Sequence, residues 1–130
     1  MGQRLLLDTH ALIWASYAPA RLSAASRQAL EDTSNEVFVS PISAFEIANK
    51  HRLGKLDEAR SLARAFARNV FDRGFREMPL TAAHGQLGGN LASAHRDPFD
   101  RLLIAQAKIE DLVLVSNETL FDEFGLTRLW

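Results

Sequence analysis

Residues 95–107, with the sequence HRDPFDRLLIAQA, constrain the fold more than any other stretch of this chain. Pro98 suits the first position of a helix, where its missing N–H costs no hydrogen bond, and Asp97 before it is a suitable N-cap. The residues that follow are apolar almost all the way round: Leu102, Leu103, Ile104, Ala105 and Ala107. Such a pattern is typical of a helix that is buried on most sides, so we expect this one at the centre of the fold.

Two carboxylates stand at the mouth of this helix. Asp97 and Asp100 are three residues apart and therefore share a helix face. One interpretation is structural, with Asp97 as the cap and Asp100 as a favourable charge in the first turn. The other is that the pair forms half of a metal site, and the rest of the chain must decide between the two.

Composition narrows the classes of protein to consider. With 130 residues, 47% hydrophobic and 24% charged, we expect a single domain over residues 1–130 with a real core. The net charge of −1 gives no sign that bulk charge drives nucleic-acid or membrane binding, and no apolar run reaches membrane-spanning length. The absence of cysteine excludes disulfides, thiolate nucleophiles and thiolate zinc sites, and fits the cytoplasm.

Apolar, β-branched runs alternate along the chain with segments of helical character. We expect strands over residues 4–7, 36–40, 75–80, 112–116 and 126–130. We expect the other helices over residues 9–15, 23–31, 42–53, 57–72, 81–91 and 117–124. This alternation predicts an α/β fold with a mainly parallel central sheet of four to five strands flanked by helices. Trp14, Phe45 and Trp130 are expected in the core.

Acidic residues recur where the strands end. Asp8 follows the first strand, Glu118 follows the strand over 112–116, and Glu46 lies in the helix after the second strand. Each has a structural explanation by itself, but together with Asp97 and Asp100 they would converge on one edge of the sheet. Carboxylates that lie close together repel unless a cation neutralises them. Oxygen ligands without cysteine or a histidine pair favour Mg²⁺ or Mn²⁺ over zinc.

The ordered set of motifs resembles the PIN-domain nucleases, and among them the VapC-type toxins of bacterial toxin–antitoxin pairs. The resemblance rests on residues 8–14 (DTHALIW), 39–50 (VSPISAFEIANK), 54–56 (GKL), 95–107, and 114–121 with Phe121 at its end. No one motif is specific, but their order covers nearly the whole chain. The resemblance implies a three-layer PIN-like fold and an Mg²⁺- or Mn²⁺-dependent ribonuclease that hydrolyses RNA phosphodiester bonds.

Carried over by motif, the catalytic and metal-binding acids of the family fall on Asp8, Glu46, Asp100 and Glu118. Glu118 departs from the family pattern, because an Asp normally follows the Ser or Thr at that strand end. The longer side chain could act through water or be dispensable, and Asn117 could replace it if the register differs by one. Asp97 belongs to the motif either as a metal ligand or as the cap alone.

Several polar neighbours of these acids are candidates to hold water or phosphate. Thr9, Ser40 and Ser116 lie beside the acids, and Arg101 could contact a phosphate or form an ion pair with an acid. His10 and His95 are expected to hydrogen-bond around the site.

The resemblance further implies two kinds of protein partner, a small VapB-like antitoxin held in a groove of the early helices and a second copy of the chain in a homodimer. Two alternatives stay open. The first is a PIN-like domain that binds without cleaving. The second is a receiver-type phosphoacceptor domain, although the acid pair, acceptor Asp and Lys that a receiver needs are not found at the expected places.

Overall fold

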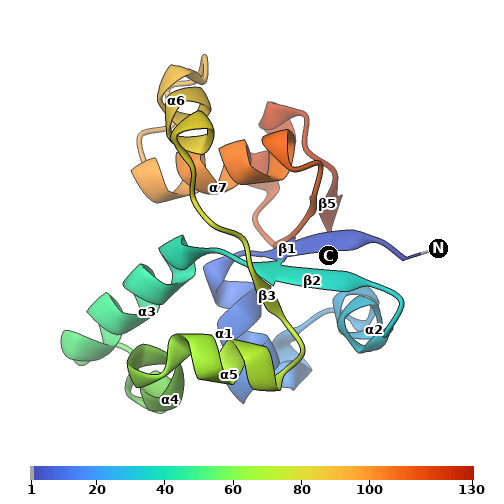
Figure 1. Cartoon of the computed structure of the whole chain (residues 1–130), viewed down its shortest axis with the longest axis vertical. Helices are drawn as coiled ribbons and strands as arrows, with labels where there is room; N and C mark the ends of the chain where they lie inside the picture. Colours follow the sequence, from blue (N-terminus) through green and yellow to red (C-terminus); the bar gives the residue numbers. More distant parts are fainter. Residues whose placement is uncertain (1) are drawn as a thin grey trace.

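The computed structural model describes residues 2–130 and has the expected alternation of strands and helices (Figure 1). Five strands form one sheet: β1 (Arg4–Leu7), β2 (Glu36–Val39), β3 (Arg76–Glu77), β4 (Val113–Val115) and β5 (Arg128–Leu129). Their order is β3-β2-β1-β4-β5, and each of the four pairings is parallel. The predicted α/β class and central sheet are confirmed, and β1 lies in the middle of the sheet.

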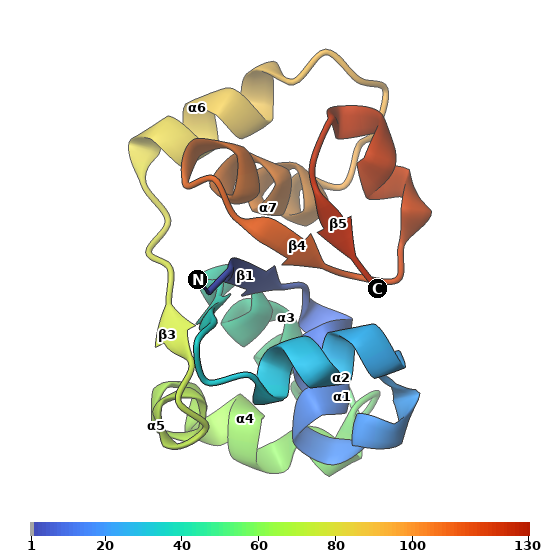
Figure 2. The same ribbon diagram turned by 90° about the vertical axis from the view of Figure 1, so that its right-hand side faces the viewer.

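Helices cover both faces of this sheet. The α-helices are α1 (Thr9–Tyr17), α2 (Ala24–Glu31), α3 (Pro41–Arg52), α4 (Arg60–Arg64), α5 (Phe66–Asp72), α6 (Ala82–Asn90) and α7 (Pro98–Ile109). Short 3₁₀ helices are η1 (Pro19–Arg21), η2 (Asp57–Ala59) and η3 (Thr119–Phe124). Helices α6 and α7 lie on one side of the sheet and α1, α2, α4 and α5 on the other, which gives three layers (Figures 1 and 2).

The central strand divides the hydrophobic core into two parts. Leu5 and Leu7 point to the layer of α1 to α5, whereas Leu6 between them packs against α7 and η3. All three side chains are fully buried. A continuous apolar run is what a parallel strand covered on both faces requires, because successive side chains point to opposite faces.

Helix α7 forms most of the second layer, as its sequence predicts. Leu103, Ile104, Ala105 and Ala107 are buried in it. Helix α6 packs closely against it, and a Cβ added at Gly88 would lie 3.1 Å from the carbonyl oxygen of Arg101. Glycine therefore permits the close approach of the two helices.

The prediction of one helix over residues 57–72 is wrong. The segment is divided into η2, α4 and α5, and Ala65 between the last two has non-helical dihedral angles of φ −141° and ψ 55°. The side chain of Asn69 donates to the carbonyl oxygens of Ser61 and Ala65 and so stabilises the break. Leu62 and Val70, on either side of the break, are both buried, so the apolar spacing continues across it. The periodicity of the sequence therefore did not reveal the break.

Three smaller expectations also need correction. The strand expected over residues 75–80 is reduced to Arg76–Glu77 at the edge of the sheet, and the 117–124 segment is the 3₁₀ helix η3. Phe45 is not in the core but 56% exposed, because it lies on the outward face of α3. Within residues 2–130, no helix has the length and apolar character needed to cross a membrane.

Candidate functional site

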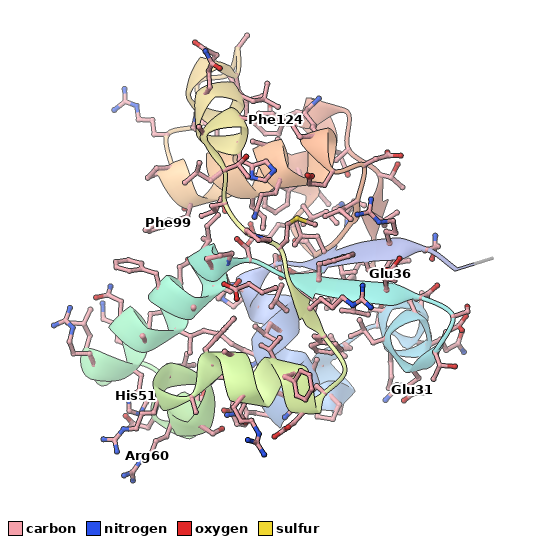
Figure 3. The ribbon with its side chains drawn as sticks, in the orientation of Figure 1. Glu31, Glu36, His51, Arg60, Phe99 and Phe124 are labelled. Carbon is pink, nitrogen blue, oxygen red and sulfur yellow. The ribbon has the colours of Figure 1, made fainter. Side chains whose placement is uncertain are left out.

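A cavity of about 170 Å³ opens where β1 and β4 end, between α1, α3, α7 and η3. Its lining includes every acid that the sequence singled out: Asp8, Glu46, Asp97, Asp100 and Glu118. Phe99 lies at the start of α7 on the side facing α3 (Figure 3) and packs against Phe45, with ring centroids 5.4 Å apart. We call the cavity lined by these five acids the acidic cavity.

Asp8 occupies the carboxyl end of the central strand and is also the N-cap of α1. Its Oδ1 accepts a hydrogen bond of 2.7 Å from the backbone N–H of Ala11. Burial raises the pKa of the Asp8 carboxyl, opposed by hydrogen bonds from the Ser116 hydroxyl and the Ala11 amide. Glu118 adds repulsion that raises this pKa further. The sheet therefore holds a carboxylate in a place where its charged form is disfavoured without a counterion.

Glu46 enters the cavity from α3 and is held by a chain of hydroxyl groups. The Thr9 hydroxyl donates to Glu46 Oε1 over 2.7 Å, and the Ser43 hydroxyl lies 2.9 Å from Thr9 Oγ1. Because Thr9 has one hydroxyl proton and gives it to the carboxylate, Ser43 must be the donor to Thr9. Ser43 was not among the residues predicted from the sequence, although it lies one helical turn before Glu46 and shares its face.

Asp100 lies opposite, in the first turn of α7. Nε2 of His95 is 2.8 Å from Asp100 Oδ2, so the imidazole donates to the carboxylate. Burial raises the pKa of Asp100, the His95 hydrogen bond opposes this, and the charges of Asp97 and Glu118 raise it further. The repulsion expected among clustered acids is therefore present around Asp100.

Asp97 and Glu118 lie nearer the solvent. Asp97 caps α7, with its Oδ1 accepting from the backbone N–H of Phe99 over 2.9 Å, and its side chain is exposed. Glu118 precedes η3, and Oε1 lies 3.8 Å from Nδ1 of His10. Asn117 is exposed and lies outside the cavity lining, so the chain turns Glu118 rather than Asn117 toward the other acids.

In the part of the chain that the structure describes, Arg101 forms no ion pair with an acid. Its guanidinium donates to carbonyl oxygens of the preceding helix and loop, those of Gly88, Gly89, Leu91, Ser93 and His95. These bonds tie residues 88–95 to the start of α7 and bring His95 to Asp100. Arg101 thus stabilises the loop beside the site.

Two predicted neighbours have structural partners. Ser40 is fully buried and caps α3 by accepting from the N–H of Ile42, 3.1 Å away. The Ser116 hydroxyl accepts from the N–H of Glu118 over 3.0 Å. Neither serine belongs to the lining of the acidic cavity. Each holds the backbone of a nearby segment, at Ile42 and at Glu118. Thr9, by contrast, lines the cavity as expected.

The donor set fits a hard divalent cation, because five carboxylates line one small cavity and two of them have raised pKa values. Within residues 2–130, however, no three His, Asp or Glu side chains converge closely enough to ligate one ion as they stand. Binding a cation therefore requires side chains to move; Asp97 is exposed, and Glu46 and Glu118 are half-buried.

A family model for the PIN domain matches residues 5–125. The chain belongs to the PIN domain family. The family predicted from the motifs is thereby confirmed, and the receiver-type alternative is excluded. No curated protein matches the sequence.

Solved structures share this fold across nearly the whole chain. VapBC2 from Rickettsia felis, bound to a DNA fragment from its promoter, is 18% identical with a TM-score of 0.74, covering 98% of each chain. DNA-bound VapBC from Salmonella typhimurium is 16% identical with a TM-score of 0.69, covering 100% of this chain and 98% of the other. FitAcB from Neisseria gonorrhoeae is 19% identical with a TM-score of 0.63, covering 97% and 96%.

Proposed function

We propose that this PIN domain is an Mg²⁺- or Mn²⁺-dependent endoribonuclease and the toxin of a toxin–antitoxin module. The observation that supports this most directly is the convergence of Asp8, Glu46, Asp100 and Glu118 on one cavity at the carboxyl end of a parallel sheet. Four separate segments of chain contribute these acids, and a cap or a solvated helix face would not bring them together. The family and the site chemistry point to the same reaction.

Asp8, Glu46 and Asp100 are the residues we expect to hold the cation. A divalent cation bound there would stabilise the charge that develops on phosphate oxygens during hydrolysis. Thr9 fixes the orientation of Glu46, and His95 does the same for Asp100. Glu118 is nearer the solvent and is free to orient the attacking water and accept its proton.

We further propose a small antitoxin protein as a partner in the cytoplasm, and a homodimer as the working form. Solved structures with this fold include VapBC and FitAB bound to DNA and a toxin-antitoxin complex from Klebsiella pneumoniae, which supports the first part. A PIN domain that only binds RNA is the second candidate, since the Glu at position 118 departs from the usual Asp.

The test is cleavage of single-stranded RNA by the purified chain with Mn²⁺ or Mg²⁺, and with EDTA. We expect cleavage that requires metal and is lost in Asp8→Asn. Binding of RNA without cleavage at any metal concentration would favour the second candidate. Absence of both binding and cleavage would refute the proposal. As an independent check, either cation should raise the melting temperature, since it binds the folded state.

A further inference from the structure

A second cavity, of about 290 Å³, adjoins the acidic cavity. His10 and Lys50 line both, so the two cavities are continuous across these side chains. The second cavity extends from there to Trp14, Arg21, Lys55 and Leu56. We call it the basic pocket.

The charge changes sign between the two cavities. The acidic cavity has five carboxylates, whereas the basic pocket has the cations Arg21, Lys50 and Lys55 and a single acid, Glu58. In the described part of the chain, none of these three cations forms a salt bridge. A cleft lined by charges of one sign raises the local concentration of ligands of the opposite sign, here anions.

The basic pocket also has an aromatic wall. The imidazole of His10 stacks on Trp14 with ring centroids 5.6 Å apart, and the guanidinium of Arg21 lies 4.8 Å over the same indole. Ile13 and Leu56 add apolar surface beside it. Nucleobases in single strands stack on aromatic rings and on arginine planes, while cations contact the phosphates.

We propose that the basic pocket binds the nucleotide next to the scissile phosphate of a single-stranded RNA. Each nucleotide repeats one negative charge and one flat apolar base, and the pocket offers a partner for both. Lys50 lies at the junction of the two cavities and contacts the phosphate between them, while Arg21 and Lys55 contact the next phosphate and base. This inference rests on the proposed ribonuclease function, and it makes the pocket a determinant of substrate binding.

The variants Arg21→Ala and Lys55→Ala test the proposal. Both side chains are exposed and form no salt bridge among the described residues, so the fold should tolerate their removal, although Arg21→Ala also loses the contact with the Trp14 ring. Arg27→Ala on α2 is the matched control, because it removes an exposed cation that lines neither cavity. Binding of a short fluorescent single-stranded RNA is measured in an Asp100→Asn background, in which cleavage is prevented.

We expect Arg21→Ala and Lys55→Ala each to weaken RNA binding severalfold and Arg27→Ala to leave it unchanged. The slope of log affinity against log salt should fall in magnitude by about 0.7 for each phosphate that the variant no longer neutralises. In the cleaving protein, the same two variants should raise KM more than they lower kcat.

Three results would overturn the assignment. Equal losses in Arg27→Ala would show that only general charge matters. Unchanged RNA affinity in both variants, with normal cleavage by the parent protein, would refute the pocket while leaving the ribonuclease function intact. Unchanged RNA affinity with loss of a co-expressed antitoxin would assign the pocket to a protein segment. If the parent protein neither binds nor cleaves RNA, the proposed function itself fails.

Discussion

The two walls of the acidic cavity are built differently. One wall carries Asp8 and Glu46 and is formed by the end of β1 and by α3, with the Thr9 and Ser43 hydroxyl groups between them. The other carries Asp97 and Asp100 at the start of α7, beside a loop that Arg101 ties down through backbone carbonyls. Asp8 is placed by the sheet, whereas Asp100 is placed by a helix end and its histidine partner.

This difference shows which acids depend on their neighbours. Asp8 and Asp100 have short side chains fixed by the central strand and by the first turn of a buried helix. Glu46 has a longer side chain, and Thr9 is its hydrogen-bond partner among the described residues. We therefore expect Asp8, Glu46 and Asp100 to be equally essential, but their supporting residues to differ in importance.

The largest effect should come from removing Asp8 or Asp100, one acid from each wall. Asp8→Asn and Asp100→Asn each lose a charged ligand, and we expect cleavage to fall by at least about a hundredfold, because metal stabilisation of phosphate charge amounts to several kcal/mol. Initial rates at saturating Mn²⁺ measure this. An active Asp8→Asn protein with an inactive Asp100→Asn protein would show that one wall suffices.

The supporting residues should give a smaller and unequal effect. Thr9→Val removes the partner of Glu46, and we expect Mn²⁺ affinity to fall by roughly 10- to 100-fold, as is common for residues that orient ligands. His95→Gln should lower it less, because the first turn of α7 still places Asp100. Titration calorimetry gives both affinities. Equal losses in the two variants would remove the distinction between the walls.

Substitution by Asn at each position distinguishes the role of Asp97 from that of Asp100. Asn at position 97 keeps the cap on α7 but removes the charge, so Asp97→Asn should retain cleavage within about threefold of the parent and lose almost no stability. Asp97→Ala also removes the cap and should cost about 1 kcal/mol of unfolding free energy. Loss of activity in Asp97→Asn, with activity retained in Asp100→Asn, would reverse the assignment of the two acids.

The smallest effect concerns stability without metal. Because burial raises the pKa of folded Asp8 above its value of 3.8 in the unfolded chain, the carboxylate destabilises the fold. This penalty is absent below pH 3.8, grows as pH rises through the window between the two pKa values, and is complete above it. In Asp8→Asn, the side-chain oxygen still accepts the hydrogen bond from the Ala11 N–H, but no charge is buried.

The Asn variant should therefore be more stable than the parent at neutral pH, and the advantage should disappear in acid. Urea unfolding at several pH values, with EDTA present, checks this. If Asp8→Asn were less stable at neutral pH, the charge on Asp8 would have to be compensated within the fold itself.

Much of this arrangement could be predicted from local sequence. Asp97-Pro98 marks the start of α7, and the apolar run at residues 4–7 becomes the central strand. These features depend on interactions within one turn of helix or one strand. The break at Ala65 was missed because the packing on either side preserves the apolar spacing.

The sequence by itself determined the α/β class, the identity of the acids and the edge of the sheet where they meet. Its motifs also indicated the family. Only the tertiary structure decided what each neighbour does: that Ser43 supports Thr9 and Glu46, that Arg101 binds carbonyl oxygens, and that Glu118 rather than Asn117 faces the cavity. These outcomes depend on contacts between segments far apart in the chain. Helix capping and strand formation depend on residues close together in the sequence and are therefore visible as sequence patterns. The hydrogen-bond partner of a polar side chain depends on which distant segments the fold places next to it.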